Sequence, residues 1–142
     1  MKYHFKIHRE KDGYWAECIE MPGCFTEGDN LSELKKNMEE VLNLYLEEPD
    51  NSKVIFPLPE KKINKNNVYA VSVRPNIAFS MLLRMYRIEN KITQRQAASK
   101  LGMKNIYSYQ KLEKAKTSNP TLKTLFKIKE VFTDFNYNLI FC

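Results

Sequence analysis

The chain has 142 residues, of which 43% are hydrophobic, and a formal net charge of +6. This length suits one ordinary domain or two small ones, and no apolar run approaches the roughly 18 residues that a membrane span needs. Residues 1–67 hold 10 Lys and Arg against 13 Asp and Glu, net −3, whereas residues 68–142 hold 13 against 4, net +9. The basic half indicates a domain that binds phosphates, and the acidic half could attract a basic protein partner. The alternative is that both sets of charges only keep the chain in solution.

The first 27 residues are predicted to form three strands. Tyr3, Phe5 and Ile7 alternate with polar residues over positions 1–8, which is typical of a half-buried strand. Asp12-Gly13 predicts a hairpin turn before a second strand at 14–21, and Pro22-Gly23 a turn before a third at 24–27. From residue 31 the period changes to that of a helix with one apolar stripe, made of Leu31, Leu34, Met38, Val41, Leu42, Tyr45 and Leu46. Residues 1–48 are therefore predicted to form a small α+β domain, an antiparallel sheet covered by one helix.

The helix start and the connector that follows have clear signals. Asn30 and Glu33 form a predicted capping box, and Pro49 ends the helix. Residues 49–67 contain three prolines and four asparagines, which resist regular structure, so this stretch is predicted to be the linker. Its apolar centre at 54–56 is expected to pack on one of the domains.

Residues 68–142 are predicted to form a helical domain flanked by short strands at 68–73 and 136–141. Helices are expected from Pro75 to about residue 89, from a Thr93/Gln96 capping box to Gly102, and from about 106 to 114. The last helix starts after Asn119-Pro120, with an inward set of Leu122, Leu125, Phe126 and Phe132. The two flanking strands have free edges, so we expect them to pair across a homodimer or a larger homo-oligomer.

The helix over 106–114 presents a polar outer face. With Tyr109 and Leu112 inward, steps of 100° per residue turn Tyr107, Lys111 and Lys114 outward. Amides and hydroxyls can reach base edges, and lysines and arginines contact phosphates. The predicted DNA-binding residues are Gln94, Arg95, Tyr107, Ser108, Gln110, Lys111 and Lys114.

The C-terminal half resembles the Xre/Cro-type helix-turn-helix. The resemblance rests on ITQRQAASKLG, YSYQKLEKAK and NPTLKTLFKIKEVF, which supply the T-Q pair, the A-x-x-L-G turn, the L-E end of the recognition helix and the N-P-x-L opening of the next helix. One residue more than usual lies between Gly102 and Tyr109. A second register, in which Gln110 and Lys111 exchange roles, therefore stays open.

The N-terminal half is similar to the first domain of HicB-type antitoxins. A strand, a G-Y-x-A-x strand, the turn 21-MPGCFTEGD-29 and an amphipathic helix occur in that family's order. The resemblance implies a degenerate RNase H-like fold that covers a HicA-type toxin, a small ribonuclease that degrades mRNA. It also implies a second domain that represses the operon.

Acidic side chains of the first domain are candidates for binding that toxin, because an mRNA-cleaving partner carries a cationic surface. They are Glu17, Glu20, Glu27 and Asp29. A two-metal nuclease site needs carboxylates from several elements in one pocket, whereas these four cluster on one hairpin and turn. The cysteines Cys18, Cys24 and Cys142 lack metal-ligand spacing, and His4 and His8 lie about 13 Å apart on a strand. We therefore expect no catalysis, no metal, no cofactor and a reducing cytoplasm.

Two functions remain. The first is an antitoxin that neutralises a HicA-type toxin and represses its own operon. The alternative is a stand-alone Xre-like regulator whose first domain senses a ligand. A small basic open reading frame beside the gene would distinguish them.

Overall fold

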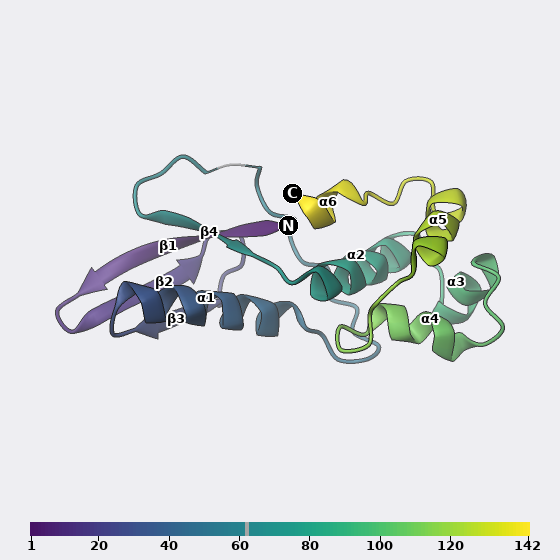
Figure 1. Cartoon of the computed structure of the whole chain (residues 1–142), viewed down its shortest axis with the longest axis horizontal. Coiled ribbons are helices and arrows are strands. Elements are labelled where there is room, and N and C mark those ends of the chain that lie inside the picture. Colours follow the sequence, from purple (N-terminus) through teal and green to yellow (C-terminus); the bar gives the residue numbers. More distant parts are fainter. Residues whose placement is uncertain (62) are drawn as a thin grey trace. The chain divides into compact units, whose positions relative to one another are not determined.

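The computed structural model describes residues 1–61 and 63–142, which divide into two compact units (Figure 1). The first unit comprises Met1–Leu46 and Phe56–Arg74, and the second comprises Glu47–Ile55 and Pro75–Cys142. An antiparallel sheet with one helix forms the first unit, and helices form the second. The predicted α+β fold class is confirmed.

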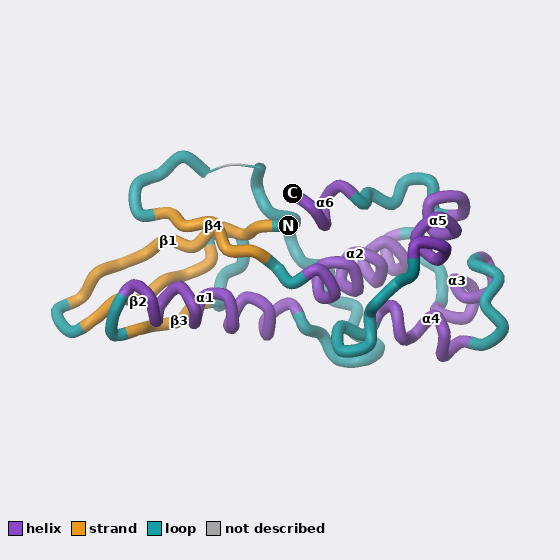
Figure 2. The backbone as a smooth tube through the Cα atoms, viewed as in Figure 1, coloured by secondary structure: helices purple, strands orange, loops and turns teal. Residues whose placement is uncertain are grey.

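The sheet of the first unit has the strand order β3-β2-β1-β4, with every neighbouring pair antiparallel (Figure 2). Its strands are β1 (Lys2–Glu10), β2 (Gly13–Cys18), β3 (Phe25–Gly28) and β4 (Val68–Ser72). Cross-strand pairs such as Phe5 with Cys18 and Tyr3 with Val71 place buried side chains on one face. Neighbouring positions along each strand point to the opposite face.

Helix α1 (Leu31–Leu46) covers the buried face of the sheet, and Leu34, Met38, Leu42 and Leu46 form its buried stripe. Asn30 caps the helix, because its Oδ1 accepts the Glu33 N–H at 2.9 Å. The carboxylate of Glu33 accepts the N–H of Asp29 at 2.9 Å, one residue before the expected partner. The capping signal in the sequence therefore located the helix start correctly.

The predicted strand at 68–73 belongs to the first unit, which corrects its assignment to the C-terminal domain. Strand β4 pairs with β1 from Lys2 opposite Ser72 to Lys6 opposite Val68. Strand β1 has β2 on one edge only, and its other edge carries backbone groups that need partners. The side chain of Val71 is buried in the same core as Tyr3, so pairing also buries apolar surface. The chain therefore passes between the two units at 46–47, at 55–56 within the predicted linker, and at 74–75.

The predicted linker is divided between the units. Glu47–Ile55 belongs to the second unit, and the chain returns to the first unit at Phe56. Phe56 is buried, with its ring 5.9 Å from that of Tyr45, and Pro57 O accepts the Tyr3 hydroxyl at 2.8 Å. The expected packing of the apolar centre is thus confirmed for Phe56, while Val54 and Ile55 stay exposed.

The second unit contains α2 (Pro75–Glu89), α3 (Gln94–Lys100), α4 (Ile106–Glu113), α5 (Leu122–Val131) and the short α6 (Asn138–Phe141). Its core gathers side chains from four helices and the turns between them. They include Ile77, Met81, Leu82, Leu83, Met85, Ala97, Ala98, Leu101, Tyr109, Leu112, Ile128, Phe132 and Phe135. The paired alanines of α3 are buried as the sequence indicates.

The C-terminal tail ends in helix α6, so the predicted strand at 136–141 is wrong. A lone strand leaves its backbone groups unpaired, whereas a helical turn pairs them internally. The tail is held by side chains: Phe135 packs in edge-on geometry against Phe79 and Tyr86, and the Tyr137 hydroxyl donates to Leu125 O at 2.6 Å. Burial raises the pKa of Tyr137 to about 12.

Helix α5 differs from its predicted orientation. Phe132, just after its end, is buried, and Leu125 is half-buried, but Leu122 is 79% exposed and Phe126 71% exposed. The buried Ile128 lies about 60° from Leu125 on the helical wheel and about 140° from the stripe that Leu122 and Phe126 share. An apolar stripe of α5 is therefore left uncovered within the second unit.

Candidate functional site

Local signals fix the two helices that carry the predicted DNA-binding residues. Thr93 Oγ1 accepts the Gln96 N–H at 3.1 Å, and Gln96 Oε1 accepts the Thr93 N–H at 2.8 Å, which completes the predicted capping box. Gly102 has a φ of +67°. Its N–H and that of Met103 donate to Ser99 O and Ala98 O, the pattern of a Schellman cap. Helix α3 thus starts and stops where the sequence indicates.

Helix α4 has the register in which Tyr109 and Leu112 point inward. Asn105 caps it by accepting the Ser108 N–H at 3.0 Å. Tyr109 and Leu112 are buried, while Tyr107 and Lys111 are exposed. The extra residue after Gly102 is therefore absorbed in the turn, and Lys111 rather than Gln110 lies on the outermost line.

Glu113 connects three helices of this unit, although its sequence position at the end of α4 gave no sign of that. Its carboxylate is 5% exposed and accepts hydrogen bonds from Arg87 at 2.5 and 3.0 Å and from the Tyr109 hydroxyl at 2.5 Å. Burial alone would lower the pKa of Arg87, but the hydrogen bonds and charge of Glu113 raise it overall. Burial together with Glu113 also raises the pKa of Tyr109.

The carboxylate of Glu113 also positions the side-chain amides of two predicted DNA-binding residues. Gln94 Nε2 donates to Glu113 Oε2 at 3.0 Å, and Gln110 Nε2 donates to Gln94 Oε1 at 3.1 Å. Gln94 stands at the start of α3 and Gln110 in α4, so this chain of bonds joins the two helices. A reading side chain held in this way loses little entropy when it binds.

Five of the seven predicted DNA-binding residues line one hollow of about 360 Å³. These are Gln94, Tyr107, Gln110, Lys111 and Lys114. Arg95 and Ser108 are exposed on the same two helices but lie outside the hollow, and the Ser108 hydroxyl donates to Asn105 Oδ1 at 3.2 Å. We call the seven residues the α3–α4 face.

Sequence reasoning missed the acidic wall of this hollow. Glu48, Asp50 and Asn51, which were predicted to belong to the linker or its edge, line it together with the α3–α4 face. Asp50 Oδ2 lies 3.2 Å from Lys114 Nζ. No local signal in the sequence reveals this contact, because it joins residues 64 positions apart.

The first unit presents a second polar surface, on the sheet face opposite α1. The register places Lys6 opposite Glu17, His8 opposite Trp15, and Trp15 opposite Glu27. The His8 ring stacks on Trp15 with centroids 4.0 Å apart, and Phe25 is 64% exposed. A hollow of about 600 Å³ on this face is lined by Glu10, Trp15, Glu17, Cys18, Pro22, Gly23, Phe25, Thr26 and Glu27. We call these residues the sheet hollow.

The structure separates the four acids predicted to bind a toxin. Glu17 and Glu27 line the sheet hollow, whereas Asp29 is exposed in the turn before α1 and does not line it. Glu20 is not a surface acid: its side chain is 4% exposed and accepts from His4 Nδ1 at 2.7 Å and from the His4 N–H at 2.9 Å. That buried pair ties β1 to the turn after β2, so the side chain of Glu20 is not on the exposed surface where it was expected.

Two general properties of the described residues bear on the chemistry. In residues 1–61 and 63–142, no three His, Cys, Asp or Glu side chains are grouped so that they could hold a metal ion. The helices of the same ranges are too short or too polar to cross a membrane.

Comparison with known proteins agrees with the geometry of the second unit. A family model described as helix-turn-helix matches residues 83–133, from within α2 to just past the end of α5. The second unit is therefore the DNA-binding unit of a regulator, with α3, the turn at Gly102 and α4 as the helix-turn-helix itself.

Comparison with curated proteins gives relatives of the chain. It is 36% identical over 52 residues to a UPF0150 protein of Archaeoglobus fulgidus, covering 36% of this chain and 75% of the relative. The UPF0150 protein of Thermoplasma acidophilum is 38% identical over 48 residues, which cover 33% of this chain and 70% of that protein. An uncharacterized 14.9 kDa protein of Haemophilus phage HP1 is 38% identical over 47 residues, 35% of its own length. The chain belongs to the UPF0150 family and carries a helix-turn-helix of the DNA-binding kind.

Proposed function

We propose that the chain is an antitoxin that represses its own operon through the second unit and neutralises a HicA-type mRNA-degrading toxin through the first. The observation that carries the proposal is the sheet hollow, an acidic and aromatic surface in a chain whose other unit binds DNA. A protein that only bound DNA would have no use for such a surface.

For the DNA-binding role, the α3–α4 face supplies both kinds of contact that DNA requires. Tyr107, Ser108 and Gln110 stand on the recognition helix α4, where side chains reach base edges. Lys111, Lys114 and Arg95 are exposed cations at its margin, and such cations contact phosphates.

For the toxin-binding role, the sheet hollow combines charge with anchors. Glu10, Glu17 and Glu27 give it a negative margin, which complements the cationic surface of an RNA-cleaving enzyme. Trp15 and Phe25 supply aromatic area of the kind that dominates binding energy in protein interfaces. The proposed role is binding: of the four acids expected to contact the toxin, Glu17 and Glu27 line the hollow, while Glu20 is paired with His4 and Asp29 lies outside it.

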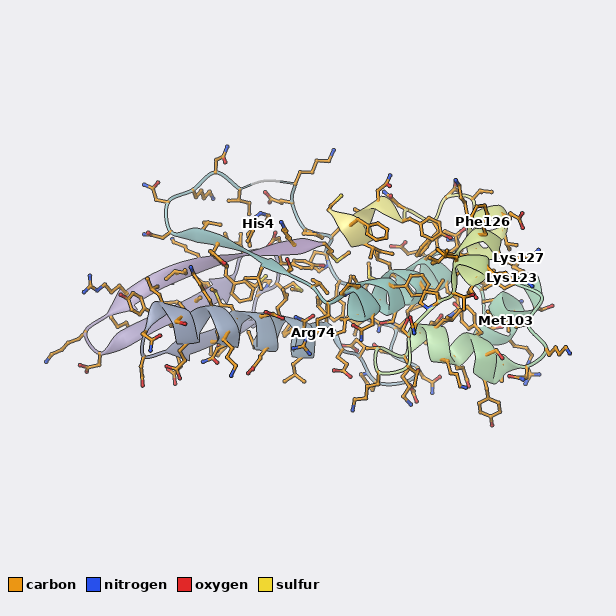
Figure 3. All side chains as sticks on the ribbon, viewed as in Figure 1. His4, Arg74, Met103, Lys123, Phe126 and Lys127 are labelled. Atoms are coloured by element: carbon orange, nitrogen blue, oxygen red, sulfur yellow. The ribbon has the colours of Figure 1, made fainter. Side chains whose placement is uncertain are left out.

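Two copies of the chain are proposed to pair through α5, because the predicted dimer strand at 136–141 is not a strand, and β4, although at the edge of its sheet, belongs to the first unit and not to the DNA-binding unit. Leu122 and Phe126 form an exposed apolar stripe, beside a hollow of about 540 Å³ that Met103, Lys123, Lys127 and Glu130 help to line. Figure 3 labels Phe126, Met103, Lys123 and Lys127. A two-fold arrangement suits the paired half-sites of most operators.

Co-expression with the small basic open reading frame adjacent to the gene tests the proposal. The wild-type chain is expected to co-purify with that protein and to abolish its toxicity. Changing Glu17 and Glu27 together to Lys is expected to remove both effects, whereas Glu40→Lys, on the exposed side of α1, is the matched control and should keep them. Wild-type neutralisation that survives the Glu17 and Glu27 changes would contradict the assigned surface.

The stand-alone regulator remains a second candidate, because a hollow of about 600 Å³ is also of a size that holds a small molecule. In that case no neighbouring protein co-purifies. The affinity for the operator then changes when a small ligand is added, and Trp15→Ala removes that change.

A further inference from the structure

The segment Glu47–Ile55, here called the acidic arm, has a defined fold within the second unit. Residues Pro49-Asp50-Asn51-Ser52 form a tight turn in which the Ser52 N–H donates to Pro49 O at 3.2 Å. Asn51 has a φ of +67°, a conformation that asparagine tolerates better than most residues. The Ser52 hydroxyl also donates to Glu48 Oε2 at 2.5 Å, which closes the turn from the other side.

Helix α2 anchors the arm to the body of the second unit. Arg84 is buried in α2, and its Nη2 donates to Val54 O at 3.3 Å. Burial lowers the pKa of Arg84, and the negative charges of Glu48 and Glu113 oppose that shift. Glu48 of the arm therefore offsets part of the cost of burying this guanidinium.

The arm places the carboxylate of Asp50 beside Lys114 of the α3–α4 face. Asp50 Oδ2 lies 3.2 Å from Lys114 Nζ, and both groups are well exposed to solvent. Glu48, Asp50 and Asn51 form one wall of the hollow whose other wall includes Gln110, Lys111 and Lys114. A carboxylate oxygen at this distance from a lysine stands where a phosphate oxygen of bound DNA would make the same charge-assisted contact.

We propose that the acidic arm is autoinhibitory: it competes with DNA phosphates for Lys114 and screens Lys111, and so lowers the affinity of the second unit for DNA. The proposal rests on the DNA-binding role of the α3–α4 face. Solvent-exposed ion pairs are weak, so the arm attenuates binding and does not abolish it.

The test measures binding of the full-length chain to two labelled duplexes, one from its own promoter region and one unrelated, at several salt concentrations. Asp50→Asn is expected to tighten binding to both duplexes by about two- to fivefold per protomer, since the effect is on phosphate contacts. It should also steepen the dependence of log affinity on log salt by about one per protomer, because Lys114 then neutralises a further phosphate and the DNA releases the counterion held there.

Glu60→Gln is the matched control, since it removes one exposed carboxylate from the first unit. It should leave both affinities near those of the wild type, and equal gains for Glu60→Gln and Asp50→Asn would overturn the proposal in favour of simple net charge. Lys114→Ala should weaken binding more in the Asp50→Asn background than in the wild type. Equal losses in the two backgrounds would show that the arm does not occupy Lys114, whereas no loss from Lys111→Ala or Lys114→Ala in either would refute the DNA-binding face itself.

Discussion

Each unit of the molecule buries one glutamate, and the two are used differently. Glu20 in the first unit pairs with His4, a side chain that carries charge only when protonated, and with a backbone N–H. Glu113 in the second unit pairs with Arg87, which is charged at every accessible pH, and also holds Tyr109 and Gln94. One closes a turn of a sheet, and the other joins three helices and fixes two reading amides.

The comparison shows how little the identity of an acid says about its role. Glu17 and Glu20 are three residues apart, yet Glu17 lines an open hollow while Glu20 is 4% exposed. The difference comes from the strand end: β2 stops at Cys18, so Glu20 is turned back toward β1. When a buried carboxylate has all its partners, removing either the carboxylate or one of the partners costs stability.

The largest effect is expected from Glu113→Ala. It leaves the Arg87 guanidinium buried without its partner, and breaking such a pair typically costs about 3–5 kcal/mol of unfolding free energy. Amide hydrogen exchange, read separately for the two units, should show faster exchange across α2, α3 and α4 and little change in the sheet. Glu89→Ala, at an exposed position at the end of α2, is the control and should change stability by no more than about 0.5 kcal/mol. A loss below about 1 kcal/mol for Glu113→Ala would contradict the connecting role assigned to this carboxylate.

A smaller loss is expected from Glu20→Ala in the first unit. The change leaves the His4 N–H and ring nitrogen without their partners, and each buried unsatisfied group costs about 1–3 kcal/mol. Exchange should rise in β1 and in the turn after β2 while the helices of the second unit stay protected. Glu17→Ala, on the open face, provides the comparison and should leave exchange unchanged. If both variants behave alike, Glu20 is not structural.

Gln110, which Glu113 positions through Gln94, and Lys111 are expected to affect DNA binding in different ways. Gln110→Ala is expected to weaken binding to the operator alone by about 1–3 kcal/mol without changing the salt slope. Lys111→Ala should weaken operator and unrelated DNA alike and flatten the slope by about two for a dimer. Anisotropy titrations at several salt concentrations separate these patterns. Exchanged behaviour of the two variants would show that the outer line of α4 is misplaced.

The smallest effect concerns alkaline pH and Tyr109. Its pKa is raised in the folded chain, so the neutral phenol contributes stability below its unfolded pKa of about 10, and that contribution is lost as pH rises above this value. Tyr109→Phe removes the hydrogen bond to Glu113 and should cost about 1 kcal/mol at neutral pH. The gap between wild type and variant should then narrow above about pH 10 in denaturant titrations. A gap that widens instead would contradict the raised pKa.

Much of the second unit follows from its sequence. The Thr93/Gln96 box and Gly102 act over three or four residues, and the inward places of Tyr109 and Leu112 follow from helical periodicity. Hydrogen bonds and steric limits over three or four residues depend on the local sequence alone, so the sequence is enough to predict these features.

Other features depended on contacts between distant residues. Val68–Ser72 joined β1 because an edge of that strand had no partner, and residues 138–141 form a helical turn in which the Ile140 N–H donates to Tyr137 O. The exposure of Leu122 and Phe126, the burial of Glu20 and the place of Asp50 beside Lys114 were likewise decided in tertiary packing. Alternation and periodicity tell which side chains share a face, but which face finds a partner is a property of the assembled molecule.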